Sequence, residues 1–251
     1  VASARKAFEI WRSVSRVQRA EVLYRVAKLI EERTDQLAQA ISMETGKNYN
    51  ESIAEVNEAL HMAQYAFGSG RTPQGESVAS EISSKDSYML RKPKGVIAII
   101  SPWNFPLAIG AFWCAAPALV EGNTVVIKPS EDAPLSTQLA VEIYHDVDHI
   151  CFTGSAEVGQ YIRGVCAKSW SKTCSCELGS KSAVIVFDDA NFDMAVSACI
   201  ASSFKLSGQR CVSASRLIVQ RGIYDKFCDS FRHYAYQVKA GPPFTDRGFI
   251  V

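Results

Sequence analysis

Several polar or sterically constrained residues of this sequence stand close to the ends of short apolar runs. They are Trp103, Asn104, Lys128, Glu131, Gly154, Ser155, Glu177 and Gly179. In sheets of parallel strands, ligands bind beyond the carboxyl ends of the strands, so residues at these positions are the first candidates for a binding or catalytic site.

Cys211 is the candidate nucleophile among the eight cysteines. It follows the polar run Ser207-Gly208-Gln209-Arg210, and the adjacent Arg210 cation favours a reactive thiolate. The alternative is that Cys211 is a small buried apolar residue. Glu177 precedes a glycine, and a carboxylate at a buried strand end can act as a general base near neutrality. Its alternative is an exposed charge at the end of a strand.

Two other segments are suited to a nucleotide. Gly154 and Ser155 lie between an apolar run and a helical pattern, an arrangement that points backbone N–H groups at a pyrophosphate. The alternative is an ordinary turn with a serine cap. Lys128 and Glu131 could both bond a ribose, and the Glu131 carboxylate would repel a 2′-phosphate, which favours NAD over NADP. The alternative for these two residues is a solvated ion pair.

The elements that must position these residues indicate an α/β fold with a doubly wound parallel sheet. Short β-branched runs alternate with helical patterns, as in sheets covered on both faces. The expected strands are Val96–Ile100, Thr124–Ile127, His149–Phe152 and Val184–Phe187, with Arg216–Val219 as a further one. The expected helices are the first sixty-odd residues, Leu107–Leu119, the segment around Leu135, Leu139 and Ile143, the segment from Val158 to Val165, and Tyr224–Val238. Gly68–Asp86 is expected to be an extended or hairpin-like connector.

Composition narrows the classes of function. The 251 residues are 47% apolar, and 27 basic residues balance 26 acidic ones, so we expect neither nucleic-acid nor membrane binding. Eight cysteines without a signal-peptide core at Val1–Phe8 indicate reduced thiols, and the Cys174-Ser-Cys176 spacing does not match a metal motif. We therefore expect no metal site and a cytoplasmic protein, with the mitochondrial matrix as the alternative.

The motifs together resemble the NAD(P)-dependent aldehyde dehydrogenase superfamily. The motifs that carry the resemblance are Glu44-Thr45-Gly46-Lys47, Pro102-Trp103-Asn104-Phe105-Pro106, Lys128-Pro129-Ser130-Glu131, Phe152-Thr153-Gly154-Ser155 with Glu157-Val158-Gly159, Glu177-Leu178-Gly179 and Gly208-Gln209-Arg210-Cys211. The resemblance implies a Rossmann-like cofactor domain at residues 1–205 and the start of an α/β catalytic domain at 206–251. It also implies oxidation of an aldehyde to an acid (EC 1.2.1.-), with NAD preferred over NADP.

The resemblance further implies the role of each residue. Cys211 is implied to add to the aldehyde, Asn104 to donate to the oxyanion, and Glu177 to activate water. Cofactor contacts are implied for Lys128, Glu131, Ser155, Gly154, Trp103 and Gly179. The run Cys211–Leu217 is similar to branches of the family that oxidise amino-acid-derived semialdehydes.

The sequence also departs from the family pattern. Residues 143–149 run directly into Ile150, so a strand–helix unit of about 30 residues is expected to be missing. The long stretch that follows in relatives, including the arm that forms dimers or tetramers, is not in the sequence. Ser180 replaces a usual glycine and is expected to crowd the nicotinamide end. These departures raise an alternative, a catalytically silent structural or interaction subunit.

Overall fold

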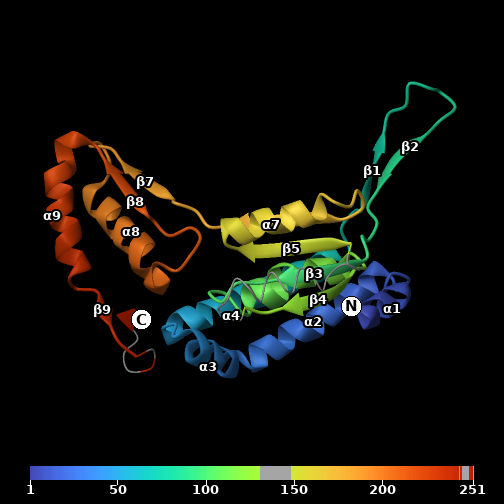
Figure 1. Cartoon of the computed structure of the whole chain (residues 1–251), viewed down its shortest axis with the longest axis horizontal. Coiled ribbons are helices and arrows are strands. Elements are labelled where there is room, and N and C mark those ends of the chain that lie inside the picture. Colours follow the sequence, from blue (N-terminus) through green and yellow to red (C-terminus); the bar gives the residue numbers. More distant parts are fainter. Residues whose placement is uncertain (131–147, 243, 245–248, 251) are drawn as a thin grey trace. The chain divides into compact units, whose positions relative to one another are not determined.

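The computed structural model describes residues 1–130, 148–242, 244 and 249–250, and the chain divides into two units (Figure 1). The first unit comprises Val1–Arg33 and Asn57–Glu177, and the second comprises Thr34–Val56 and Leu178–Val251. This division differs from the predicted boundary between residues 205 and 206. It differs because the residues after Leu178 already pack with the C-terminal helix in one core of their own.

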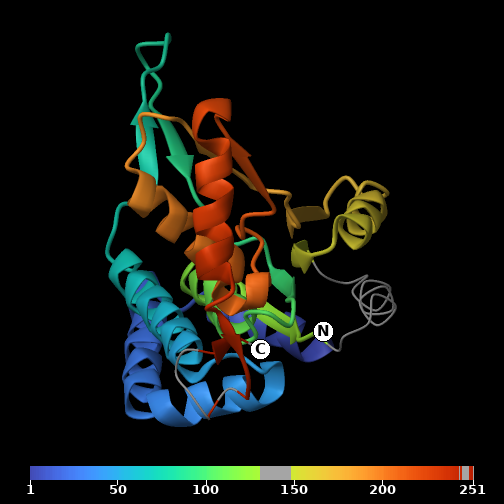
Figure 2. The ribbon, with the colours of Figure 1, turned by 90° about the vertical axis from the view of Figure 1, so that its left-hand side faces the viewer.

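Four helices form the first part of the chain, as predicted. They are α1 (Ala2–Trp11), α2 (Arg16–Glu32), α3 (Thr34–Thr45) and α4 (Tyr49–Ser69). Ser15 begins α2 with a capping box, in which its side chain and that of Gln18 satisfy each other's backbone N–H groups. Within the first unit, Ala20 and Leu23 of α2 pack on Ala66 of α4, and the two helices run side by side (Figure 2).

A four-stranded sheet is the centre of the first unit. Its strands are β3 (Val96–Ile100), β4 (Thr124–Lys128), β5 (His149–Gly154) and β6 (Thr173–Leu178), in the order β4-β3-β5-β6. The central strand β3 is buried along its whole length and pairs in parallel with β4 and β5. The register places Ile99 opposite both Ile127 and Cys151. The parallel sheet confirms the α/β class.

Helices cover this sheet. The predicted helix at Leu107–Leu119 is a π-helix, η1 (Ala108–Trp113), followed by a short α5 (Ala115–Val120). Ala115 and Ala118 of α5 pack on Ile97 and Ile99. The helix α7 (Ala156–Cys166) follows β5, as predicted. The helix predicted around Leu135, Leu139 and Ile143 lies outside the described residues.

Two strands outside the main sheet form an arm of the first unit. The strands β1 (Gly75–Val78) and β2 (Ser87–Leu90) pair antiparallel, which confirms the predicted hairpin-like connector. Both views show the arm extending away from the sheet (Figures 1 and 2). Its side chains are mostly exposed, with Tyr88 at 67% and Leu90 at 70%.

The second unit has a smaller parallel sheet of its own. Its elements are β7 (Ala183–Val186), α8 (Phe192–Phe204), the 3₁₀ helix η3 (Lys205–Gly208), β8 (Arg216–Val219), the 3₁₀ helix η4 (Arg221–Ile223), α9 (Tyr224–Ala235), β9 (Lys239–Ala240) and β10 (Phe249–Ile250). The core joins Val186, Val196, Cys199 and Phe227. The prediction that Val184–Phe187 belongs to the main sheet is wrong, because β7 pairs with β8 and the position in the main sheet belongs to β6.

Candidate active site

The candidate cofactor residues of the first unit follow its strands. Lys128 is the last residue of β4 and pairs with Ile100, and Trp103 and Asn104 follow β3. The Trp103 side chain is exposed, whereas Lys128 and Asn104 are half-buried. Glu131 lies outside the described residues. The carboxyl ends of two neighbouring strands therefore carry the segments that the sequence selected.

Gly154 and Ser155 join β5 to α7. Ser155 is the N-cap of α7, and its hydroxyl accepts a hydrogen bond from the backbone N–H of Val158 at 3.3 Å. The residue is thus a serine cap, which was the simpler alternative. The same cap begins an eleven-residue helix whose first turn is suited to an anion, so the cap is compatible with a pyrophosphate contact.

Gly154 is constrained by a neighbouring ring. A Cβ at this position would lie 2.6 Å from Cζ of Phe152, whose side chain is buried. We predict that Gly154→Ala lowers the free energy of unfolding by about 1–3 kcal/mol, because the ring cannot retreat from a packed interior without cost. Urea denaturation of the purified chain measures this change.

Gly164 of α7 provides the matched control. A Cβ there meets no heavy atom within 4 Å. Gly164→Ala should stabilise the chain by up to about 1 kcal/mol, because alanine has the higher helix propensity. Equal effects of the two substitutions would contradict the steric explanation.

Glu177 is the next-to-last residue of β6, and its side chain is exposed. Of the two alternatives for this residue, the structure therefore favours the exposed charge at a strand end, because Ser175 and Glu177 lie on the exposed side of a strand whose other residues are half-buried. Glu177 lies within electrostatic range of Cys114 and opposes ionisation of that thiol.

In the second unit, Gly179 and Ser180 are both exposed, and Ser180 Oγ lies 3.1 Å from Ser182 Oγ.

Cys211 is exposed in the second unit and follows a strained run of backbone. Leu206 and Ser207 adopt φ angles of 55° and 53°, and Gly208 adopts 73°. Left-handed φ at two consecutive non-glycine residues costs roughly 1–3 kcal/mol each and persists only where the surroundings impose it. Cys211, the candidate nucleophile, thus lies three residues after a run of left-handed backbone that ends at Gly208.

Glu51 is one group that holds this run. Its Oε1 accepts a hydrogen bond of 2.7 Å from the backbone N–H of Leu206, whose side chain is buried. Arg210 turns toward the end of α8, where its Nη2 lies 3.5 Å from the carbonyl oxygens of Ala201 and Ser202. Polar contacts at Leu206 and Arg210 therefore hold the segment that leads into Cys211.

Removing the Glu51 carboxylate should loosen this loop. We predict that Glu51→Ala costs about 1–2 kcal/mol of local stability, because the N–H of Leu206 loses a charged acceptor. Amide hydrogen exchange at Leu206–Gly208 should become faster. Glu58→Ala, at an exposed position of α4, should leave it unchanged, and unaltered exchange in the Glu51 variant would disprove this role.

A buried ion pair lies near the start of α4, the helix that carries Glu51. The Lys47 ammonium binds the Glu55 carboxylate, and these side chains are only 4% and 0% exposed. Burial lowers the pKa of Lys47, and the nearby Glu55 opposes this shift. Lys47 belongs to a motif that was predicted from the sequence, whereas Glu51 and Glu55 were not predicted. Their spacing of four residues on one helix face, after Lys47, is the signal that could have identified them.

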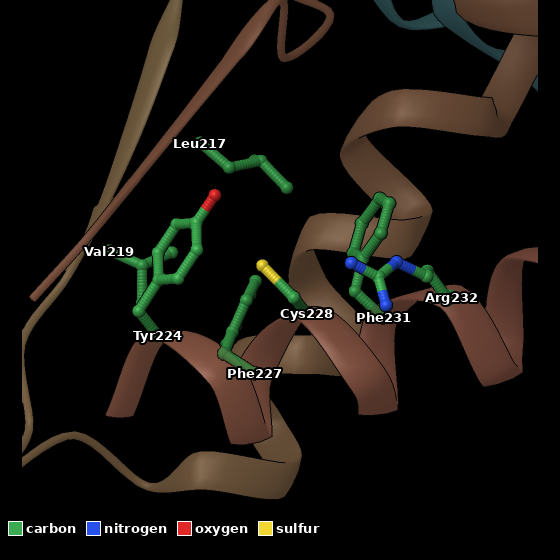
Figure 3. A pocket seen from close by; sticks show the side chains of 7 residues that line it. All are labelled: Leu217, Val219, Tyr224, Phe227, Cys228, Phe231 and Arg232. Carbon is green, nitrogen blue, oxygen red and sulfur yellow. The ribbon is translucent and has the colours of Figure 1, made fainter. Parts of the chain in front are cut away.

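The second unit also contains a pocket of about 230 Å³ (Figure 3). It lies between β8 and α9, and the side chains of Tyr224 and Cys228 border it. None of the candidate site residues lines this pocket.

Within the described ranges, no group of three or more His, Cys, Asp and Glu side chains is placed to hold a metal ion, and no helix is long and apolar enough to cross a membrane.

Comparison with known proteins identifies relatives. The chain matches the aldehyde dehydrogenase family over residues 1–148 and 144–250. It is 34% identical to a mitochondrial succinate-semialdehyde dehydrogenase of Arabidopsis thaliana over 273 positions, which cover 98% of this chain and 51% of that protein. An NADP-dependent enzyme of E. coli has a TM-score of 0.92 at 32% identity, with 99% of this chain and 57% of that chain covered. A betaine aldehyde dehydrogenase of Staphylococcus aureus in complex with NAD+ has a TM-score of 0.90 at 30% identity, with 99% and 56% covered.

The comparison also indicates that the relatives contain residues that this chain lacks. The chain spans about half the length of these relatives. The two stretches that match the family overlap at residues 144–148, and the alignment with the Arabidopsis protein is 22 positions longer than the chain, at 273 against 251. Both findings agree with the predicted loss of a strand–helix unit ahead of Ile150. So does β4, which lies at the edge of the main sheet in the described part of the chain.

Proposed function

Because the chain belongs to the aldehyde dehydrogenase family, we propose that it acts in the NAD(P)-dependent oxidation of an aldehyde to a carboxylic acid. The observation that carries the proposal is the ordered set of motifs around Asn104, Lys128, Ser155, Glu177 and Cys211 in a chain of this family. The exposed thiol of Cys211, on a loop held in a rare backbone conformation, supports its assignment as the nucleophile.

The proposed chemistry divides among three side chains. The Cys211 thiolate adds to the aldehyde carbon, and the Asn104 amide donates a hydrogen bond to the oxygen that gains negative charge. NAD(P), if bound, would supply the hydride acceptor, and loss of the hydride would leave the acyl group on Cys211 as a thioester. Glu177 then takes a proton from the water that hydrolyses this thioester. The exposure of Glu177 is consistent with contact between its carboxylate and water.

The residues that would hold the cofactor belong mostly to the first unit. The proposal assigns Gly154 and Ser155 at the start of α7 to the pyrophosphate, Lys128 and Glu131 to the ribose, and Trp103 and Gly179 to the remaining contacts. The cap of α7 fits this assignment because a helix N-terminus stabilises an anion. We propose NAD in preference to NADP on the charge of Glu131, although the relatives include enzymes of both kinds.

A semialdehyde is the proposed class of substrate. The run Cys211–Leu217 and the succinate-semialdehyde dehydrogenase among the relatives both support it. A homo-oligomer, either a dimer or a tetramer, is proposed for the full-length protein. Location in the cytoplasm stays a prediction, with the mitochondrial matrix as the alternative.

NADH production measured with a panel of semialdehydes and simple aldehydes tests the proposal. We expect NADH with at least one aldehyde, and a mass increase on Cys211 corresponding to the acyl group when the reaction is quenched early. Calorimetric titration with NAD and NADP gives the cofactor preference. A folded chain that binds neither nucleotide and yields no NADH would contradict the proposal and leave the silent structural subunit.

A further inference from the structure

Five of the eight cysteines lie in the first unit, around β5 and β6. They are Cys114, Cys151, Cys166, Cys174 and Cys176. Three of them belong to α7 and β6, where the thiol of Cys176 points to the carbonyl oxygen of Gly159 at 3.9 Å and that of Cys166 points to the carbonyl oxygen of Thr173 at 4.0 Å. The proposed function uses none of the five.

Cys114 and Cys151 form a separate pair. Cys114 is the residue between η1 and α5, and Cys151 lies on β5. Both side chains pack on the same buried cluster of Ile97, Ile99 and Ala115, and both are half-buried rather than sealed. The two thiols are hydrogen-bonded to each other. Two elements far apart in sequence thus bring two free thiols within hydrogen-bonding reach of each other.

The hydrogen bond gives the two thiols different properties. It lowers the pKa of Cys114, although burial and the Glu177 carboxylate oppose this effect. The same bond raises the pKa of Cys151, and burial adds to that shift. The hydrogen bond therefore favours ionisation of Cys114 over ionisation of Cys151. This arrangement is typical of a reactive thiolate beside a resolving thiol.

We propose that Cys114 and Cys151 are a redox-sensitive pair that closes into a disulfide on exposure to a peroxide. The Cys114 thiolate attacks one oxygen of hydrogen peroxide, the O–O bond breaks, and the leaving hydroxide takes up a proton as water. The sulfur of Cys151 then attacks the sulfenic acid, the S–O bond breaks, and a second water leaves. Two thiols and one peroxide become one disulfide and two waters.

The remaining thiols of the first unit are less suited to this step. Burial is the main cause that raises the pKa of Cys166, Cys174 and Cys176, so these thiols form less thiolate than Cys114. Closure of the pair would join the start of α5 to β5 across Ile97 and Ile99. It should raise the unfolding temperature, because the cross-link restricts the unfolded chain.

Peptide mapping of the wild-type chain under non-reducing conditions tests the proposal. After treatment with hydrogen peroxide, we expect one cross-linked species that joins the peptides of Cys114 and Cys151, is lighter by two hydrogens, and disappears with a dithiol reductant. The unfolding temperature should rise in the same sample. If both cysteines remain open to alkylation while Cys211 is oxidised, the proposal is wrong.

Single substitutions separate the two roles. Cys151→Ala should leave Cys114 as a sulfenic acid that dimedone traps, whereas Cys114→Ala should leave Cys151 reduced. Cys228→Ala, in the second unit, is the matched control and should preserve the cross-link. Trapping of sulfenic acid on Cys151 instead of Cys114 would overturn the assigned roles. The peptide mapping uses the wild-type chain, so it tests the disulfide even if one of these variants fails to fold.

Discussion

Replacing Cys211 with alanine is expected to lower aldehyde-dependent NADH formation by more than about a thousandfold, as removal of a covalent nucleophile does in other enzymes. The physical reason is that the thioester cannot form without the sulfur, and water cannot replace a positioned thiolate. Cofactor binding should persist, because Cys211 belongs to the second unit whereas most of the proposed nucleotide contacts belong to the first. Initial rates at saturating NAD+ measure the effect.

A second cysteine of the same unit makes this experiment specific. Cys228 is half-buried in α9 beside the pocket, and Cys228→Ala should keep the wild-type rate. Early quenching should show the acyl mass increase in the Cys228 variant and not in the Cys211 variant. Turnover that survives the loss of Cys211 would remove the covalent mechanism while leaving membership of the family intact.

The buried strands were predicted well because a strand that is buried on both faces contains only apolar residues. Val96–Ile100 contains only apolar residues, and the structure buries every one of them as β3. The strand β6 was missed because Thr173–Leu178 carries Cys, Ser and Glu and contains no apolar run. Its alternation of half-buried cysteines with exposed Ser175 and Glu177 is the period of a strand with one covered face, which apolar content alone does not reveal.

The candidate site was predictable only where single residues follow strands. Ser155 was identified because a serine between a strand and a helix has a local reason to be there, and its capping bond to Val158 spans three residues. The contact between Glu51 and Leu206 spans 155 residues and could not be predicted from local pattern. The left-handed backbone at Leu206 and Ser207 could not be predicted from the sequence either, because neither residue type favours this conformation.

The buried ion pair of Lys47 and Glu55 leads to the largest expected change in stability. Glu55→Ala should lower the free energy of unfolding by about 3–5 kcal/mol, because the ammonium of Lys47 would stay in the interior without its carboxylate partner. The exposed pair of Asp229 and Arg232 is the matched control, since these side chains are 78% and 67% exposed. Asp229→Ala should therefore change stability by less than about 1 kcal/mol.

The pH dependence of the Glu55 variant tests the electrostatic origin of this loss. Burial already lowers the pKa of Lys47, and removal of Glu55 takes away a group that raises it, so the pKa should fall further. The unfolded chain then binds more protons than the folded one between the two pKa values, and stability rises with pH in that window. The deficit of Glu55→Ala should therefore shrink as the pH rises toward the ordinary lysine pKa of about 10.4. A deficit independent of pH would indicate lost packing instead.

The double variant Lys47→Met with Glu55→Leu should recover most of the stability, because apolar side chains of similar size need no partner in this interior.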